Sequence, residues 1–129
     1  METNIKPVRI ERQKMAGLDL RPGESPVPEK NVLSGKVDVK REILFEGNDI
    51  EVRVFESTPA KVLHKNGFTF DEFVHILSGS LILTDSSGES HEFTAGDTLV
   101  VPTGFSGTWE MLGNYRELIV IKPRSQLKE

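Results

Sequence analysis

One carboxylate stands out as a candidate for chemistry. Glu72 enters a run of mainly apolar residues that ends at Gly79. A carboxylate in an apolar interior must be hydrogen-bonded, paired or protonated, because an isolated buried charge is too costly. Apolar surroundings would raise its pKa and make it the one credible general acid or base of the chain. We therefore predict that Glu72 is a ligand-binding and catalytic residue, with a structural hydrogen-bond anchor as the alternative.

The three histidines show no pattern of a metal or proton-transfer cluster. His75 follows Glu72 by three residues, so strand alternation sends the two side chains to opposite faces. His91 follows a turn among polar residues and is predicted at the surface. His64 precedes an apparent loop, where we expect a polar residue at the mouth of a pocket. A metal site shared by His64 and Glu72 is the alternative reading.

Two spacings of turn residues point to a fold. Six residues separate Glu72 from Gly79, and five separate Gly96 from Pro102, which is followed by Gly104. These intervals resemble the two motifs of the cupin superfamily. The resemblance implies an all-β fold, a cupin-type double-stranded β-helix or jelly-roll barrel, and it extends over about residues 52–121.

The stretch that contains Gly107, Thr108 and Trp109 is similar to the small single-domain cupins that include (S)-ureidoglycine aminohydrolase and the ethanolamine-utilisation cupins. Metal-binding cupins carry a pair of histidines before the glutamate and a third after the second motif. In this sequence only Glu72 remains, and Asn66 stands at one of the vacated positions. The resemblance thus implies no metal ligands and no cofactor. Many cupins have tyrosine at the position of His75, so the resemblance implies a partly buried, hydrogen-bonding role for this histidine. A metal-dependent hydrolase or isomerase resembling ureidoglycine aminohydrolase is the alternative.

The same resemblance predicts how a pocket is lined. The motif position of Gly107 implies that it faces the barrel interior, and alternation then turns Trp109 inward as well. The indole N–H needs a partner if it is buried, and Glu72 is a natural candidate; simple core packing is the alternative role for Trp109. Such a pocket suits a small ligand with a flat or apolar face and a hydrogen-bond donor or a cation. The predicted lining consists of Glu72, Trp109, Phe68, Asn66, Arg53 and His64.

Short β segments separated by turn residues are expected to position these side chains. The candidate strands cover residues 36–44, 50–55, 72–79, 81–84, 90–93, 99–101, 108–112 and 118–121, and Asp85 to Gly88 forms the clearest hairpin turn. No window shows a convincing helical period. We assign residues 36–123 to one barrel domain and residues 124–129 to a loose tail. Arg53 and Lys61 are the cations most plausibly near its mouth.

Residues 1–35 contain four of the seven prolines together with isolated apolar residues. This composition excludes a long helix or a central strand. We expect an extended N-terminal arm that contacts the partner subunit of a homodimer, which should weaken when residues 1–30 are deleted.

Composition restricts the remaining classes. The 129 residues include no cysteine, which excludes a disulfide framework and a thiol nucleophile. The net charge of −4 has no basic block, so we expect no nucleic-acid partner, and we expect no membrane partner and a cytoplasmic location. The leading prediction is a small-molecule-binding cupin that binds or acts on a small polar metabolite. Whether it is an enzyme stays open, and a structural or regulatory dimer sealed by Trp109 is a further alternative.

Overall fold

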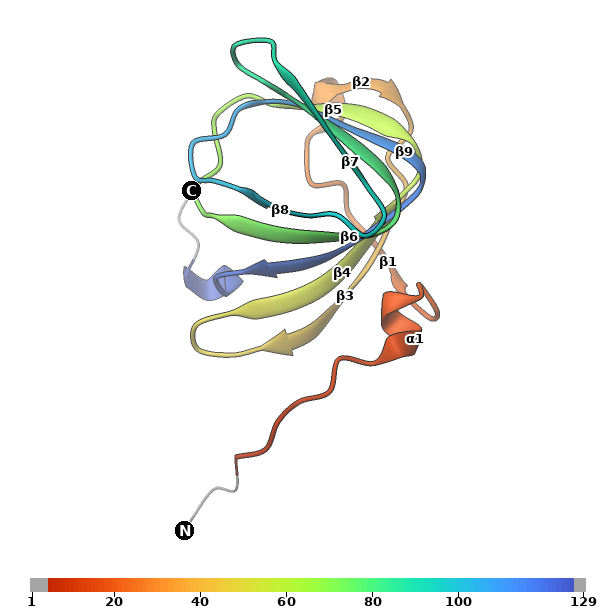
Figure 1. The fold of residues 1–129 in the computed structure, drawn as a ribbon, viewed down its shortest axis with the longest axis vertical. Coiled ribbons are helices and arrows are strands. Elements are labelled where there is room, and N and C mark those ends of the chain that lie inside the picture. Colours follow the sequence, from red (N-terminus) through yellow and green to blue (C-terminus); the bar gives the residue numbers. More distant parts are fainter. Residues whose placement is uncertain (1–4, 127–129) are drawn as a thin grey trace.

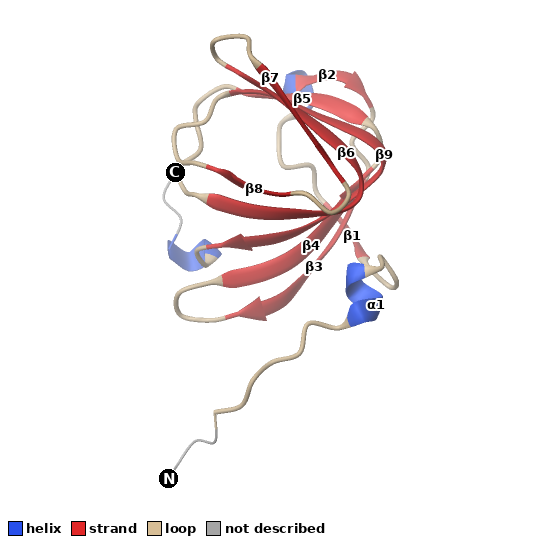
Figure 2. Cartoon of the chain, viewed as in Figure 1, coloured by secondary structure: helices blue, strands red, loops and turns tan. Residues whose placement is uncertain are grey.

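The computed structural model describes residues 5–126, in which nine strands pair into one sheet that curls around an interior core (Figures 1 and 2). All pairings in this sheet are antiparallel. This arrangement confirms the predicted all-β jelly-roll class. The strands are β1 (Arg21–Gly23), β2 (Val32–Gly35), β3 (Val39–Glu46), β4 (Glu51–Ser57), β5 (Ala60–His64), β6 (Glu72–Asp85), β7 (Ser90–Thr94), β8 (Thr98–Val101) and β9 (Gly107–Ile121).

Helical structure within residues 5–126 is limited to three short turns, as the missing helical period predicts. They are α1 (Arg12–Met15), the 3-10 turn η1 (Glu29–Asn31) and the 3-10 turn η2 (Arg124–Gln126). No helix in this described range is long and apolar enough to cross a membrane.

The strands β6 and β9 are the long central pair of the barrel. The prediction that one strand ends at Gly79 and another begins two residues later is wrong, because β6 runs through this glycine with a shifted register. Gly79 has a φ of +75°, and a Cβ there would lie 2.5 Å from the carbonyl oxygen of Leu112. Only glycine fits such a close backbone approach, so the predicted turn is a bend within one strand. Likewise, β9 joins the two strands predicted between residues 108 and 121.

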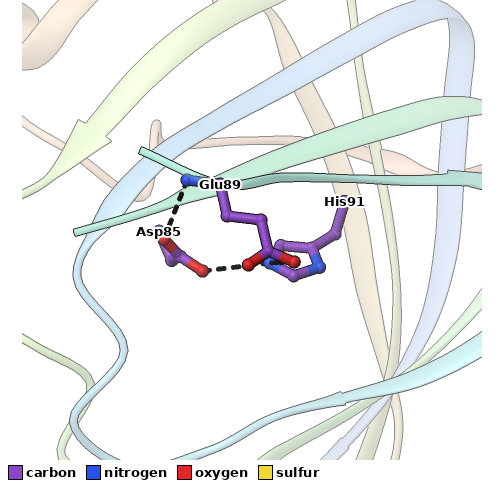
Figure 3. A group of neighbouring side chains, drawn as sticks. All are labelled: Asp85, Glu89 and His91. Atoms are coloured by element: carbon purple, nitrogen blue, oxygen red, sulfur yellow. Dashed lines mark hydrogen bonds and ion pairs between the residues drawn. The ribbon is translucent and has the colours of Figure 1, made fainter. Parts of the chain in front are cut away.

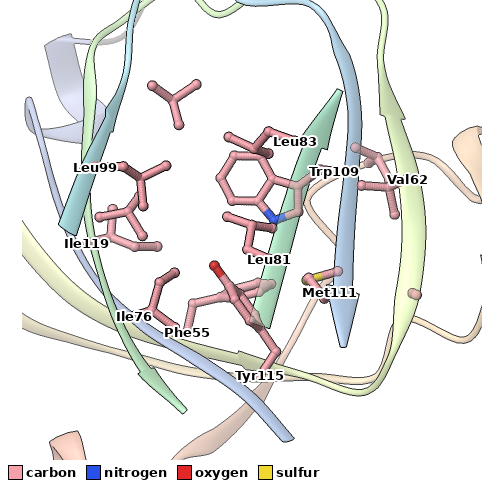
Figure 4. Close-up of a cluster of buried hydrophobic side chains, with 14 of the residues drawn as sticks. Phe55, Val62, Ile76, Leu81, Leu83, Leu99, Trp109, Met111, Tyr115 and Ile119 are labelled. Carbon is pink, nitrogen blue, oxygen red and sulfur yellow. The ribbon is translucent and has the colours of Figure 1, made fainter. Parts of the chain in front are cut away.

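Alternation along these strands fills the barrel with apolar side chains (Figure 4). On β6, Val74 and Ile76 belong to the core before the bend and Leu81 and Leu83 after it, so the irregularity changes which alternate residues face inward. The core draws on β3, β4, β5, β6, β8 and β9, and Val27 from the N-terminal segment joins it. Its largest members include Phe55, Val62, Ile76, Leu81, Leu83, Leu99, Trp109, Met111, Tyr115 and Ile119.

The predicted arm has two structurally different parts within the described residues. Residues 5–10 lead away from the barrel, and Ile5 and Val8 are exposed (Figure 1). Further along, β1 pairs with β3 and β2 pairs with β5, while Leu20 and Val27 are buried. Residues 20–35 are thus packed on the barrel. Residues 1–4 of the arm and 127–129 of the predicted tail lie outside the described part of the chain.

Candidate functional site

A cavity of about 290 Å³ lies inside the barrel, and five of the six predicted lining residues surround it. They are Arg53 on β4, His64 at the end of β5, Phe68 in the loop between β5 and β6, Glu72 at the start of β6, and Trp109 on β9. The sixth predicted residue, Asn66, does not line the cavity. Its side chain is exposed in the same loop, and the neighbouring Gly67 lines the cavity instead.

An aromatic cluster forms one wall of this cavity. The rings of Phe68 and Trp109 are stacked with centroids 6.1 Å apart, and His64 meets both edge-on at 5.1 and 5.7 Å. His64 is therefore part of β5 and of the wall, whereas the sequence predicted a loop residue. Burial lowers the pKa of its imidazole, so the ring is neutral at neutral pH. The wall offers a flat, uncharged surface for stacking.

Glu72 brings a carboxyl group to this wall. Its side chain remains partly exposed, and the residues that the structure describes form no hydrogen bond with it. The predicted bond from the Trp109 indole is absent within this part of the chain. Burial raises the pKa of Glu72 to about 7, and the positive charge of Arg53 opposes this rise. At neutral pH the group is thus divided between a proton donor and a proton acceptor, as general acid–base chemistry requires.

Arg53 is held in the wall by an acidic neighbour on its own strand. The Glu51 carboxylate lies 3.2 Å from Nε of Arg53, and its side chain is completely buried. Residues two apart on a strand face the same side, so the sequence places Glu51 and Arg53 on one face, although their ion pair was not predicted. The Glu51 carboxylate therefore balances most of the positive charge that Arg53 brings to the cavity.

Two further polar residues lie behind the cavity and were also missed. Glu117 and Tyr115 share one face of β9 and are both buried, at 2% and 0% exposure. Burial raises the pKa of Glu117 well above its usual range, and the charge of Glu72 raises it further. The Tyr115 hydroxyl lies near this carboxyl group, yet its geometry falls short of a full hydrogen bond. The buried carboxyl group of Glu117 therefore favours its protonated form more strongly than an ordinary glutamate does.

Two more cations differ in their orientation. Arg41 on β3 lines the cavity, although the sequence did not single it out. Lys61, which the sequence did suggest, is paired with Glu110 and alternates with Val62, so it points away from the interior.

The remaining histidines lie outside this cavity. His75 Nδ1 is 2.7 Å from the Thr98 hydroxyl on the neighbouring strand β8, which agrees with the expected hydrogen-bonding role. His91 lies on the β6–β7 hairpin and forms a group with Asp85 and Glu89 (Figure 3). This group contains three oxygen or nitrogen donors within 4.8 Å of one another, the only such group in the described residues.

The hairpin group is already satisfied by the protein itself. One Asp85 oxygen accepts bonds from the Ser87 amide, the Ser87 hydroxyl and the Glu89 amide, at 3.0, 2.6 and 3.1 Å. The other oxygen lies 3.0 Å from Nε2 of His91. These bonds hold the pKa of Asp85 far below its usual range, and the bond to Asp85 raises the pKa of His91. The group is a clamp on the hairpin turn predicted at Asp85 to Gly88.

A transition-metal site does not fit the cavity. Glu72 and His64 both line it, but no third carboxylate or imidazole converges with them within residues 5–126. Protein sites for such metals normally gather three or more ligands. The carboxyl group of Glu72 instead faces an uncharged aromatic surface.

A curled jelly-roll sheet with a ligand-sized interior cavity defines this protein as a cupin. Comparison with protein-family profiles matches residues 49–117 to the EutQ-like cupin domain, and the chain belongs to that family. No match to a curated protein sequence was found.

Several solved structures share the fold. A protein of unknown function from Pseudomonas syringae pv. tomato has a TM-score of 0.71 and 24% identity, over 79% of this chain and 43% of that chain. This chain thus spans less than half the length of the Pseudomonas protein. The EutQ protein of Clostridium difficile has a TM-score of 0.60 and 17% identity, over 77% and 81% of the two chains. The polyketide cyclase RemF from Streptomyces resistomycificus has a TM-score of 0.63 and 17% identity, over 96% and 89%. At these identities the likeness concerns the fold alone.

Proposed function

We propose that this cupin binds a small polar metabolite in the barrel cavity without a transition metal, and that Glu72 is the group that holds or protonates it. One observation carries the proposal: a carboxyl group with a pKa of about 7 faces a cavity without a hydrogen bond from the described residues. A carboxyl group that lines a cavity and keeps its bonding capacity is available to a ligand, and shifted pKa values are typical of functional sites.

The dimensions and the wall restrict this ligand. A volume of about 290 Å³ is at the lower end of the range for small-molecule pockets. The stacked Phe68 and Trp109 rings favour a flat or apolar face, and Glu72 favours a hydrogen-bond donor beside it. These features support a metabolite of a few heavy atoms rather than a polymer or a large cofactor.

A metabolite panel tests this proposal. Ligand-observed NMR against the wild type and Glu72→Gln should reveal compounds that bind the first and bind the second at least about tenfold more weakly, because a charge-assisted hydrogen bond is lost. Glu92→Gln is a matched control on the surface hairpin strand β7. Compounds that bind both proteins equally would contradict the role of Glu72.

The same preparation separates this proposal from a metal-dependent hydrolase resembling ureidoglycine aminohydrolase. Metal analysis after purification without chelating resins should give far less than one zinc, manganese, nickel or iron per chain. Stoichiometric metal that is lost in both Glu72→Gln and His64→Ala would contradict the metal-free proposal and favour that hydrolase.

We also propose that the protein is a homodimer in which residues 5–10 add to an edge of the partner's sheet. The exposed Ile5 and Val8 suit this role, and β8 is an edge strand that pairs only with β6. Phe73 and Val100 are cross-strand neighbours on these strands and are 41% and 57% exposed. Covering them with apolar arm residues removes apolar surface from water.

Deletion of residues 1–10 tests the role of the arm. It leaves the buried Leu20 and Val27 in place, whereas the deletion of residues 1–30 expected from the sequence would damage the core. Sedimentation equilibrium should show a weaker dimer for the shortened protein. An equally stable dimer would refute the contribution of the arm.

A further inference from the structure

We infer that the cavity has an anion subsite at Arg41, so that the ligand of this cupin carries a carboxylate at the end remote from Glu72. The inference rests on the proposed small-molecule function and narrows it to one class of ligand. It is carried by the position of Arg41, by the balance of charges around the cavity, and by the way the N-terminal segment holds this side chain.

Arg41 and Glu72 reach the same cavity from different strands. In the sheet, β3 and β6 are separated by β4 and β9, and both residues line the cavity because the sheet curls (Figure 1). Arg41 is paired with Phe55, which also lines the cavity, so the arginine lies on the inward face of its strand. One small molecule is therefore able to contact Arg41 with one end and Glu72 with the other.

The charges around the cavity leave Arg41 uncompensated. Arg53 has the Glu51 carboxylate 3.2 Å from its Nε. No carboxylate among residues 5–126 lies within 4.0 Å of the Arg41 guanidinium group, as the ion pairs of this part of the chain show. His64 adds no charge to the lining. An arginine that lines a pocket without an acidic partner presents its planar donors to a carboxylate.

The N-terminal segment positions this arginine. Strand β1 pairs with β3, and a Cβ added at Gly23 would lie 2.8 Å from Nε and 2.9 Å from Cγ of Arg41. The glycine thus leaves space for the arginine side chain to pass against the β1 backbone. Pro26, a few residues further, lines the cavity itself. The segment that the sequence presented as an arm therefore forms part of the binding site.

Benzoate and benzamide are a matched pair of probes for this subsite. Both have a flat ring for the aromatic wall and nearly the same shape, but only benzoate is charged at neutral pH. We expect calorimetric or NMR titration of the full chain to show that benzoate binds about tenfold more tightly than benzamide, because bonds between an arginine and an anion are charge-assisted. Arg41→Gln should abolish this preference and weaken the binding of benzoate to the level of benzamide.

Two variants complete the test. Lys40→Gln removes the same charge from the exposed face of the same strand and should keep the preference for benzoate. Gly23→Ala leaves Arg41 in the chain but crowds it, and it should reduce benzoate binding more than benzamide binding. The circular-dichroism spectrum shows whether the Arg41→Gln protein is folded. If it is not, the effect of Gly23→Ala on benzoate binding decides whether Arg41 forms an anion subsite.

The outcomes separate this inference from the proposed function. Equal binding of benzoate and benzamide to the wild type, lost in Glu72→Gln, would retain the pocket and overturn the anion subsite. A preference for benzoate that persists in Arg41→Gln would overturn it too. Binding of neither probe at 50-fold molar excess would contradict the small-molecule function, and the anion subsite with it.

Discussion

The molecule contains two groups of acidic and imidazole side chains, and they differ in how their hydrogen-bonding capacity is used. In the β6–β7 hairpin, both oxygens of Asp85 are occupied by donors from its own turn and from His91. In the cavity, Glu72 has no hydrogen bond from the described residues. The hairpin group stabilises a turn, whereas the carboxyl group in the cavity keeps its bonding capacity for the ligand that we propose.

The pKa values of Asp85 and Glu72 shift in opposite directions because their surroundings differ. Hydrogen bonds to the charged form lower the pKa of Asp85, and burial without such bonds raises that of Glu72 to about 7. Proximity of titratable residues alone would have favoured the hairpin, because only there do three metal-ligating residues meet among the described residues. We therefore base the proposed site on the unused hydrogen-bonding capacity of Glu72 rather than on the proximity of titratable residues.

The largest effect is expected when the aromatic wall beside Glu72 is removed. Trp109→Ala deletes a side chain that is 6% exposed and stacked on Phe68. We expect the free energy of unfolding to fall by about 3–5 kcal/mol, the usual cost of deleting a buried aromatic side chain. Chemical denaturation measures this loss. A decrease under 1 kcal/mol with ligand binding intact would show that Trp109 is neither core nor wall.

Glu72→Gln is expected to increase the free energy of unfolding at neutral and higher pH, by less than Trp109→Ala decreases it. The carboxyl group of Glu72 titrates near 4.5 when the chain is unfolded and near 7 when it is folded, so the folded state binds the proton more tightly. Stability therefore decreases as the pH rises from about 4.5 to about 7, and the loss is complete above that window. The variant lacks this loss.

Denaturation at several pH values measures the effect. We expect Glu72→Gln to be more stable than the wild type at pH 8 by roughly 1–3 kcal/mol and equally stable at pH 4. The charge of Arg53 opposes the rise in the pKa of Glu72. Burial raises the pKa of Glu117 as well, so Glu117→Gln should also reduce the pH dependence of stability. A variant that is less stable than the wild type at pH 8 would identify Glu72 as a structural anchor.

The sequence predicted the fold and much of the cavity because turn residues and alternation are local signals. Gly96, Pro102 and the Asp85–Gly88 turn punctuate the chain at the predicted places, and alternation from Gly107 turned Trp109 inward. The bend at Gly79 was misread as a strand end, since a glycine with positive φ serves either purpose.

The residues that were missed owe their position to pairing between distant strands. Arg41 reaches the cavity because β1 and β3 pair and the sheet curls, and Glu117 is buried because β9 lies between β4 and β6. Neither position follows from local spacing. Asn66 failed for the opposite reason, because a motif count placed it in the cavity although its loop carries it to the surface.

The smallest effect, and the sharpest contrast between the two groups, concerns their histidines. Burial against the aromatic wall lowers the pKa of His64, while the bond to Asp85 raises that of His91. A single NMR titration of the wild type should thus show one imidazole titrating below the ordinary value of about 6.5 and another above it.

Asp85→Asn should bring the pKa of His91 back toward that value and leave His64 and ligand binding unchanged, because the hairpin lies apart from the cavity lining. Asp97→Asn, in the next turn, is the matched control for the lost charge and should leave His91 unaffected. If Asp85→Asn weakens ligand binding as much as Glu72→Gln does, the hairpin group belongs to the functional site and the contrast drawn between the two groups is wrong.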